Sequence, residues 1–499
     1  MMPTYERLSG LDEAFLAFET PTAYMHVAAT AIFDAAPLHS ATGSVDLARI
    51  RRHVATRLPR LPRFRQRLRF IPLTQDAIWV DDEGFDLALH VRHASLPRPG
   101  TDEQLRERVA EILERPLNRA RPLWEVWIVE GLADDRFALV AKVHHCIVDG
   151  IAGVGVLANL LSLAPCEPAE ALDDWTPRPA PTDRELLRDE ATRRLRGSLA
   201  VGRSLAGALA RPRSGAARVG ATAAGLWRLA KHGLTAAPAT CFNRPIGPHR
   251  RVSWLALDLE PLRHARRRLG GTLNDVVLAC VAGALRAVLA RHRSLPVQGT
   301  VRAAVPVSVR TPDDAGIPGN RVSVWIVPLP VYERDPRARV AAVTAITTQL
   351  KSQNDAAGAT VLTQAADWTG GALRSWAVRL LGSAHIYNLI VTNVPGPPMP
   401  LYLLGARMRA AYPHLPLFEN QGLGIALLSY CDRLYVGLTA DWAERALVAE
   451  LTADLADAVA QLTASEGAEN DALARHVPSP RAGAPKPNRH RAGSFRARV

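Results

Sequence analysis

The segment His144-His145-Cys146-Ile147-Val148-Asp149-Gly150 decides how the first part of this 499-residue chain is expected to fold. It closes an apolar run, Phe137–His145, and a second apolar run, Trp124–Val129, precedes it. Gly131-Leu132-Ala133-Asp134-Asp135 separates the two runs, and apolar runs joined by such a turn predict a β-hairpin. Since side chains alternate along a strand, His145 is expected on one face of the second strand and His144 on the other.

Two adjacent histidines at a strand end admit four interpretations. A metal site is disfavoured, because neighbours on a strand diverge and the sequence has no His-Glu-x-x-His helix. A nucleophilic Cys146 would need a histidine set across from it. One histidine could instead be buried and hydrogen-bonded as part of the structure. In the fourth interpretation His145 is a general base that takes a hydroxyl proton, while Asp149 anchors the turn and Gly150 leaves room for substrate.

Composition places the chain among soluble globular proteins, since 48% of its residues are hydrophobic and 22% are charged. Its length allows two or three domains. No run of about 18 uncharged apolar residues occurs, and Glu6, Asp12 and Glu13 stand where a signal peptide would be basic and then apolar. We therefore expect a cytoplasmic protein without a spanning helix. The five cysteines are far apart, which argues against a disulfide framework and against a metal site.

The net charge of +13 is almost entirely arginine, because only four lysines occur. Arg184–Lys231 holds eleven basic and three acidic residues, and Arg475–Val499 holds seven basic and no acidic residues. Basic surfaces suit anionic lipid or a phosphorylated cofactor, and the arginine side chain binds phosphate with a planar fork of donors. Nucleic acid is disfavoured, since the sequence has neither zinc-finger spacing nor an RNP-like aromatic motif.

A proline-rich joint, Trp175–Pro181, leads into the first arginine-rich segment. That segment has helical periodicity, with an apolar stripe formed by Leu195, Leu199, Leu205 and Leu209. Two interpretations stay open for it: a solvated helix that crosses between two domains, or a helix that lies on anionic lipid.

The rest of the chain mixes strands and helices. Helices are predicted at Val45–Leu58, Ile151–Leu163 and Val276–Leu289, the last with Thr272 or Asn274 as its cap. Strands are predicted at Met25–Phe33, Val301–Val309, Arg321–Leu329, Ile386–Val394, Leu423–Tyr430 and Leu434–Leu438. The tail from Arg475 is rich in proline, glycine and arginine and is expected to be disordered.

The histidine segment is similar to the His-His-x-x-x-Asp-Gly signature of the CoA-dependent acyltransferase superfamily. Over about residues 5 to 465 the chain resembles more closely the bacterial wax ester synthase/acyl-CoA:diacylglycerol acyltransferase family. Further segments carry the resemblance: Leu8-Ser9 with Asp12 and Phe15-Leu16, Met25-His26-Val27, Pro122-Leu123-Trp124-Glu125, Pro245–Arg251, Asn274-Asp275, Val305–Ser308, Gly319–Ser323 and Asn393–Pro397. One such motif is a weak signal, but this many in order is specific. Cys146 stands where the family commonly has alanine, which is nearly as small.

The resemblance implies an α/β fold with mixed sheets. It would have two chloramphenicol-acetyltransferase-like subdomains around a substrate tunnel, joined by a long helical connection. We place the first subdomain at residues 1–174, the connection at 175–240, the second subdomain at 241–470 and a basic tail at 471–499.

The resemblance also implies direct transfer of a long-chain acyl group from acyl-CoA to diacylglycerol or to a long-chain fatty alcohol, without covalent intermediate, cofactor or metal. His145 would be the general base and acid. Asn274 would donate to the oxyanion, or it would only cap its helix. A structural role falls to His144, Asp149, Gly150 and Asp275. The substrate channel would be lined by Pro122, Leu123, Trp124, Asn393, Pro395 and Gly396, although the first three could equally be ordinary hairpin core.

A water-insoluble acceptor implies peripheral attachment to the inner face of the membrane or to lipid droplets. Other functions compatible with the fold are an acyltransferase for another hydrophobic alcohol, a catalytically weak lipid-droplet surface protein, and a carrier-dependent condensation domain. Against the second stands the intact set His145, Asp149, Gly150 and Asn274, and against the third the lack of a recognisable carrier module.

Overall fold

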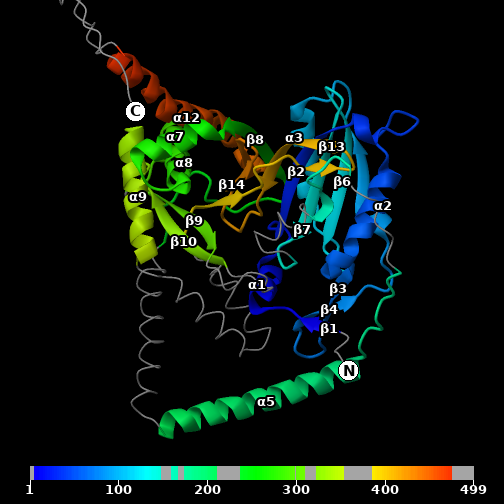
Figure 1. Ribbon diagram of the computed structural model, residues 1–499. Coiled ribbons are helices and arrows are strands. Elements are labelled where there is room, and N and C mark those ends of the chain that lie inside the picture. The colour runs from blue at the N-terminus through cyan, green and yellow to red at the C-terminus, as the bar shows by residue number, and fades with distance from the viewer. Residues whose placement is uncertain are drawn as a thin grey trace, which may run out of the picture.

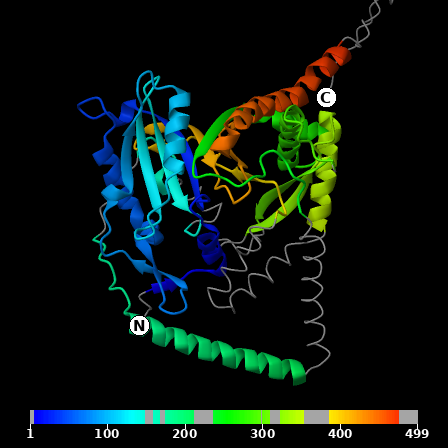
Figure 2. The same ribbon diagram turned by 180° about the vertical axis from the view of Figure 1, so that it is seen from behind.

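The computed structural model describes residues 5–147, 159–166, 174–210, 236–297, 299–308, 322–352 and 385–474. Asp149, Gly150, most of the predicted helix Ile151–Leu163 and the basic tail from Arg475 lie outside these residues. Two lobes built on mixed β-sheets lie beside each other, and helix α5 extends beneath both (Figures 1 and 2). The fold is therefore the mixed α/β arrangement that the resemblance implied.

The first lobe contains the predicted hairpin. Its strands β6 (Trp124–Leu132) and β7 (Arg136–His144) are antiparallel, with Trp124 opposite Val143. The six-stranded sheet has the order β12-β13-β2-β7-β6-β5, and all neighbours are antiparallel except β5 and β6. Its other strands are β12 (Tyr402–Leu403), β13 (Ala406–His414), β2 (His26–Asp34) and β5 (Val91–Ser95). Most side chains of β7 are buried, as expected for a central strand covered on both faces.

Helices α2 (Leu47–Arg57) and α3 (Asp102–Leu113) pack on this sheet. A capping box formed by Thr101 and Gln104 starts α3. At its other end, carbonyls that no helical turn can satisfy accept from the sheet: Lys142 Nζ donates to Ile112 O at 3.0 Å, and His26 Nε2 donates to Leu113 O at 2.8 Å. Buried polar residues of β2 and β7 thus fix the end of α3.

The second lobe has a six-stranded sheet of order β10-β9-β11-β14-β15-β8, with β11 parallel to both of its neighbours. The strands are β8 (Arg250–Asp258), β9 (Val301–Ser308), β10 (Val322–Leu329), β11 (Leu389–Pro395), β14 (Leu423–Tyr430) and β15 (Arg433–Asp441). Its helices are α7 (Leu259–Leu269), α8 (Leu273–Arg291), α9 (Pro336–Ser352) and α12 (Arg445–Ala474). Of the described helices, only α8 is long and apolar enough to cross a membrane, and most of it is buried in the core of this lobe.

Strand exchange joins the two lobes. The strands β12 and β13 follow β11 in sequence, yet they complete the first sheet, where β13 pairs with β2. The exchanged strand lies so close to β15 that a Cβ atom on Gly437 would stand 1.8 Å from Pro413 O. The boundaries predicted at residues 174, 240 and 470 did not anticipate this exchange, because each treated a lobe as one continuous stretch of chain.

A small third sheet anchors the predicted helix of the connection, α5 (Asp183–Ala210). This sheet has the order β1-β4-β3, with strands β1 (Tyr5–Arg7), β4 (Ala77–Asp81) and β3 (Gln66–Phe70). Leu186 of α5 is fully buried against it, and Glu190 binds Arg7 at 2.7 Å. Twenty-eight residues make α5 about 42 Å long, enough to extend from the first lobe to beneath the second (Figure 1).

Candidate active site

The two histidines lie at the end of β7 and in the turn that follows it. His144 is the last residue of the strand and pairs with His26 of β2. His145 begins the turn, and its N–H donates to Met25 O at 2.8 Å. The His144 residue is only 1% exposed, whereas His145 is half-buried. Of the two, His145 is therefore the one that a substrate can approach.

His144 is held as a neutral ring. Its Nδ1 accepts from the backbone N–H of Cys146 at 3.2 Å, so the proton of the neutral imidazole is on Nε2. That nitrogen lies 3.7 Å from Oε1 of Glu19, which Arg119 binds through Nε at 2.9 Å. Burial, with smaller effects of Arg119 and His145, lowers the pKa of His144 to about 3. A group with so low a pKa is a poor base near neutral pH, which fits a structural role.

Cys146 also contacts His144, with Sγ 2.9 Å from Nδ1. The sequence favoured activation of this thiol by a histidine set across from it and not by a neighbour, yet in the structure the neighbouring His144 reaches it. The pair is nevertheless not an activated one, because burial raises the pKa of the thiol well above its usual value. A neutral thiol beside a neutral imidazole does not support nucleophilic catalysis by Cys146.

Helix α1 (Gly10–Phe18) covers the turn that carries His145. The Phe15 ring is stacked on the His145 ring, with centroids 3.8 Å apart and planes 17° apart. A capping box of Ser9 and Asp12 starts the helix, and Glu19 ends it. The helix therefore brings Phe15 to one histidine and Glu19 to the other.

Trp124 begins the neighbouring strand β6, Pro122 and Leu123 directly precede it, and all three are buried next to the histidines. The His144 N–H donates to Leu123 O at 2.9 Å, and Trp124 Nε1 donates to Phe64 O at 2.8 Å. Trp124 stacks on His90 with ring centroids 4.6 Å apart. It also lines an apolar cavity of about 10 Å³ with Phe64, Val143 and other residues. These contacts are those of hairpin core, the alternative that the sequence left open.

Asn274 and Asp275 begin helix α8, and their side chains do different things. Thr272 is the N-cap, and Asp275 closes the capping box by accepting from the Thr272 N–H at 2.7 Å. Asp275 is 2% exposed and also accepts from Thr347 Oγ1 at 2.8 Å. Asn274 is not the cap; its Oδ1 accepts from Asn393 Nδ2 at 3.3 Å.

Asn393 and Pro395 are on β11, and Gly396 follows it. Gly396 approaches β14 so closely that a Cβ atom there would stand 2.1 Å from Ser429 O. The Asn393–Pro397 motif therefore fixes the end of β11 against β14 and presents Asn393 to Asn274.

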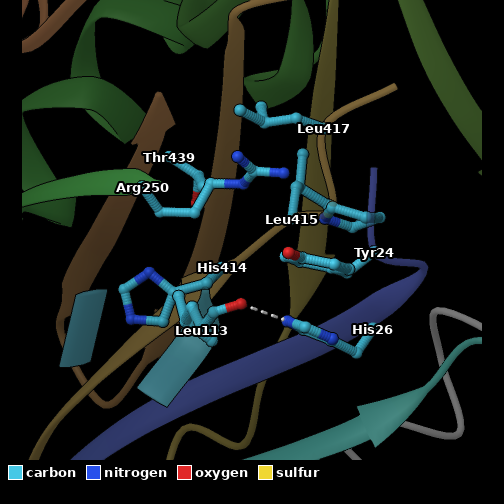
Figure 3. A pocket seen from close by; sticks show the side chains of 9 residues that line it. Tyr24, His26, Leu113, Arg250, His414, Leu415, Leu417 and Thr439 are labelled. Atoms are coloured by element: carbon cyan, nitrogen blue, oxygen red, sulfur yellow. Dashed lines mark hydrogen bonds between the residues drawn. The ribbon is translucent and has the colours of Figure 1, made fainter. Parts of the chain in front are cut away.

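A separate cavity of about 10 Å³ lies between β2 of the first sheet and β8 and β15 of the second (Figure 3). It is lined by Tyr24, His26, Leu113, Arg250, His414, Leu415, Pro416, Leu417 and Thr439. Burial lowers the pKa of His26 well below its usual value and that of His414 to about 3, so both rings are neutral. A volume near that of one water molecule is far too small for CoA. This cavity is a polar seam between the sheets and not the place of the chemistry.

Three residues beside the histidines were not singled out from the sequence: Phe15, Glu19 and Arg119. Phe15 lies within a segment that carried the family resemblance, but no role for this residue could be inferred from the sequence. Glu19 and Arg119 are 100 residues apart, and the sequence offers no pattern that would pair them.

Comparisons with known proteins agree with this architecture. The wax ester synthase/diacylglycerol acyltransferase catalytic domain matches residues 8–277, and the C-terminal domain of the same family matches residues 318–463. A putative diacylglycerol O-acyltransferase of Mycobacterium tuberculosis is 36% identical over 449 residues, which cover 87% of this chain and 85% of the relative. The O-acyltransferase WSD of Acinetobacter baylyi is 31% identical over 438 residues, which cover 87% of this chain and 92% of the relative.

Solved structures share the fold. The wax ester synthase/diacylglycerol acyltransferase from Marinobacter aquaeolei VT8 has a TM-score of 0.65 and 25% identity, covering 92% of this chain and 100% of that one. The first condensation domain of the calcium-dependent antibiotic synthetase has a TM-score of 0.55 and 18% identity, covering 91% of this chain and 96% of that one. The chain thus belongs to the wax ester synthase/diacylglycerol acyltransferase family and is an acyl-CoA-dependent O-acyltransferase.

Proposed function

We propose that this enzyme transfers a long-chain acyl group from acyl-CoA directly to the hydroxyl of diacylglycerol or of a long-chain fatty alcohol, with His145 as the general base. The observation that carries the proposal is the contrast between the two histidines. His145 is half-buried at the end of β7, whereas the neutral ring of His144 is enclosed by Cys146 and Glu19.

The proposed reaction needs one proton carrier. His145 takes the proton of the acceptor hydroxyl, and the oxygen attacks the thioester carbonyl carbon. The tetrahedral oxyanion then collapses, the C–S bond breaks, and the imidazolium returns its proton to the CoA sulfur. Nδ1 of His145 is buried, so we assign the transfer to Nε2. An ester and free CoA leave, and the chemistry requires neither a metal nor a cofactor.

Asn274 is the proposed donor to the oxyanion. Because its Oδ1 accepts from Asn393, its Nδ2 keeps both hydrogens for other acceptors. Thr272 and Asp275 already cap the helix, so the Asn274 amide is not needed for that purpose. Of the residues predicted to line the channel, Asn393 would shape the path of the two substrates, because it contacts Asn274.

The acceptor is tested by presenting purified enzyme with palmitoyl-CoA and, in parallel, hexadecanol or dioleoylglycerol. The relatives named diacylglycerol O-acyltransferase and wax ester synthase support both products, and we expect each ester to form. Esterification of a different hydrophobic alcohol alone would narrow the proposal to that acceptor. Loss of thioester without any ester, or no turnover at all, would instead favour a catalytically weak lipid-surface protein.

We further propose that the enzyme works at the inner face of the membrane or on lipid droplets, held there by its basic connection. The described part of α5 shows which of its arginines already bind a carboxylate and which could bind an anionic surface. Arg193 and Arg194 are exposed, but they bind Glu190 at 2.8 and 2.6 Å, so this carboxylate offsets part of their charge. Arg196 is exposed, and Arg203 and Arg211 follow it in the same basic segment.

The wild-type protein is expected to sediment with anionic liposomes at low salt and to be released as salt rises. A basic residue near such a surface contributes about 1 kcal/mol, and salt screens this attraction. Replacing Arg196, Arg203 and Arg211 by glutamine should weaken sedimentation by about 10²-fold, since three such contributions amount to roughly 3 kcal/mol. The matched variant, Arg193→Gln with Arg194→Gln, should lower thermal stability and change binding less. Equal binding to neutral and anionic liposomes at every salt concentration would show that electrostatic docking is wrong.

A further inference from the structure

We infer that Phe15 is a positioning residue for His145, and that helix α1 serves as the support on which the general base is held. This inference rests on the proposed role of His145. According to it, Phe15, which lies outside the histidine segment, controls the orientation of the His145 imidazole.

The stack limits the freedom of the His145 ring. The backbone of His145 is fixed by its hydrogen bond to Met25 O, which leaves two side-chain torsions to set the ring. An almost parallel ring with its centroid 3.8 Å away blocks rotation of the imidazole out of its plane, because the rotated edge would strike the Phe15 face. The stack therefore limits the direction in which Nε2 points, and the acceptor hydroxyl must lie in that direction to give up its proton.

The support of α1 gives this contact its rigidity. Arg119 binds Glu19 at the end of the helix through Nε at 2.9 Å, and the same guanidinium donates to Leu16 O at 3.1 Å. Leu16 is buried in a cluster with Leu123 and Cys146, directly beneath the turn that carries His145. The helix is thus tied and packed at its carboxyl end, where Leu16 and Ala17 are buried.

Phe15 itself packs in two directions. Besides the cluster beneath α1, it contacts a cluster formed by Met25, which directly precedes β2, with Ile246 and Leu417 of the second half of the chain. Residues from both halves of the molecule thus contact Phe15. The two halves must therefore be assembled before the His145 ring is fixed.

The face of a phenyl ring also favours a cation. When His145 takes the hydroxyl proton it becomes an imidazolium, and the negative face of Phe15 lies directly against it. This attraction is stronger for the charged ring than for the neutral one, so it favours the transition state over the ground state. Plain hydrophobic packing of Phe15 would not have this selectivity.

The test compares Phe15→Leu, Phe15→Tyr and Phe18→Leu. Leucine removes the aromatic face at position 15, whereas tyrosine keeps it. Phe18 is the matched control, because it is also a half-buried phenylalanine on the same helix but packs on Phe418, with ring centroids 5.5 Å apart. A displaced reacting group commonly costs about 10²-fold in rate. We expect Phe15→Leu to lower kcat by about that factor with little change in KM for acyl-CoA, and Phe15→Tyr to restore most of the loss.

A second measurement does not depend on turnover. In histidine-labelled protein, the carbon-bound ring protons of His145, assigned from the signal lost in His145→Ala, should lie upfield because of the Phe15 ring current. Phe15→Leu should remove this shift, and Phe18→Leu should leave it. The inference is overturned if the wild type lacks the upfield shift, or if Phe15→Leu removes the shift but keeps the wild-type kcat. It is also overturned if Phe18→Leu lowers kcat as much as Phe15→Leu does. Full activity of His145→Ala would be a different failure, that of the proposed base itself.

Discussion

Replacing His145 by alanine is expected to lower the rate of ester formation by at least about 10²-fold, which is the lower end of what a positioned general base contributes. His145 is the histidine that substrate can approach, and the neighbouring imidazole of His144 is enclosed and cannot take over its role. The measurement is the initial rate of ester formation from palmitoyl-CoA and either acceptor. Thermal unfolding should change little, since a half-buried side chain at a turn contributes less to the core than a buried one.

His144 variants supply the matched control. His144→Ala removes a buried ring that receives the Cys146 N–H, so we expect a loss of stability of roughly 1–3 kcal/mol with measurable activity. His144→Asn should lose less stability than His144→Ala, because an asparagine oxygen can accept from the same N–H. Equal residual activity in His145→Ala and His144→Ala would overturn the assignment of the base. So would a His145→Ala enzyme whose rate is close to that of the wild type.

The fold could be predicted from the sequence where a strand or helix carries its own pattern. Leu423–Tyr430 was predicted with the bounds that β14 has, and the hairpin β6–β7 was predicted from its turn. The strands β8 and β13 were missed, although each has nine residues. Exposed Arg407 and Arg409 interrupt the apolar pattern of β13, and β8 begins with two arginines, of which Arg250 is buried. Both strands pair with partners far away in the chain. Strand exchange depends on such long-range pairing, and local periodicity carries no information about it.

The site could be predicted in part for the same reason. Strand alternation predicted a contrast between the two adjacent histidines, but in the structure His145 stands in the turn after the strand, and the partners of each ring come from elsewhere. Glu19 reaches His144, and Arg119 reaches Glu19, only because α1 folds across the end of β7. The Thr272 cap was one of two candidates in the sequence, and the structure selects it over Asn274. A sequence motif identifies important residues. Whether such a residue caps a helix or acts in catalysis is decided by its contacts in the folded chain.

Because Asn274 is not the cap of α8, its replacement is expected to affect catalysis rather than stability. Asn274→Ala is expected to cut kcat by about 10²–10³-fold with little change in melting, as removal of one oxyanion donor does elsewhere. Its side chain makes one described hydrogen bond, to Asn393, and the cap of α8 is supplied by Thr272 and Asp275. Steady-state kinetics with saturating acyl-CoA and a melting curve on the same protein measure the two quantities.

Neighbouring variants distinguish donation from support. Asp275→Ala should lower the melting temperature, because it removes the capping-box acceptor and leaves Thr347 without its partner carboxylate in a buried site. Asn393→Ala should act like a weaker Asn274→Ala: it frees Oδ1 of Asn274 and lets the amide turn, so kcat falls while the donor is still present. If Asn274→Ala instead melts early and retains kcat, the amide is structural, and the donor to the oxyanion must be sought at another residue.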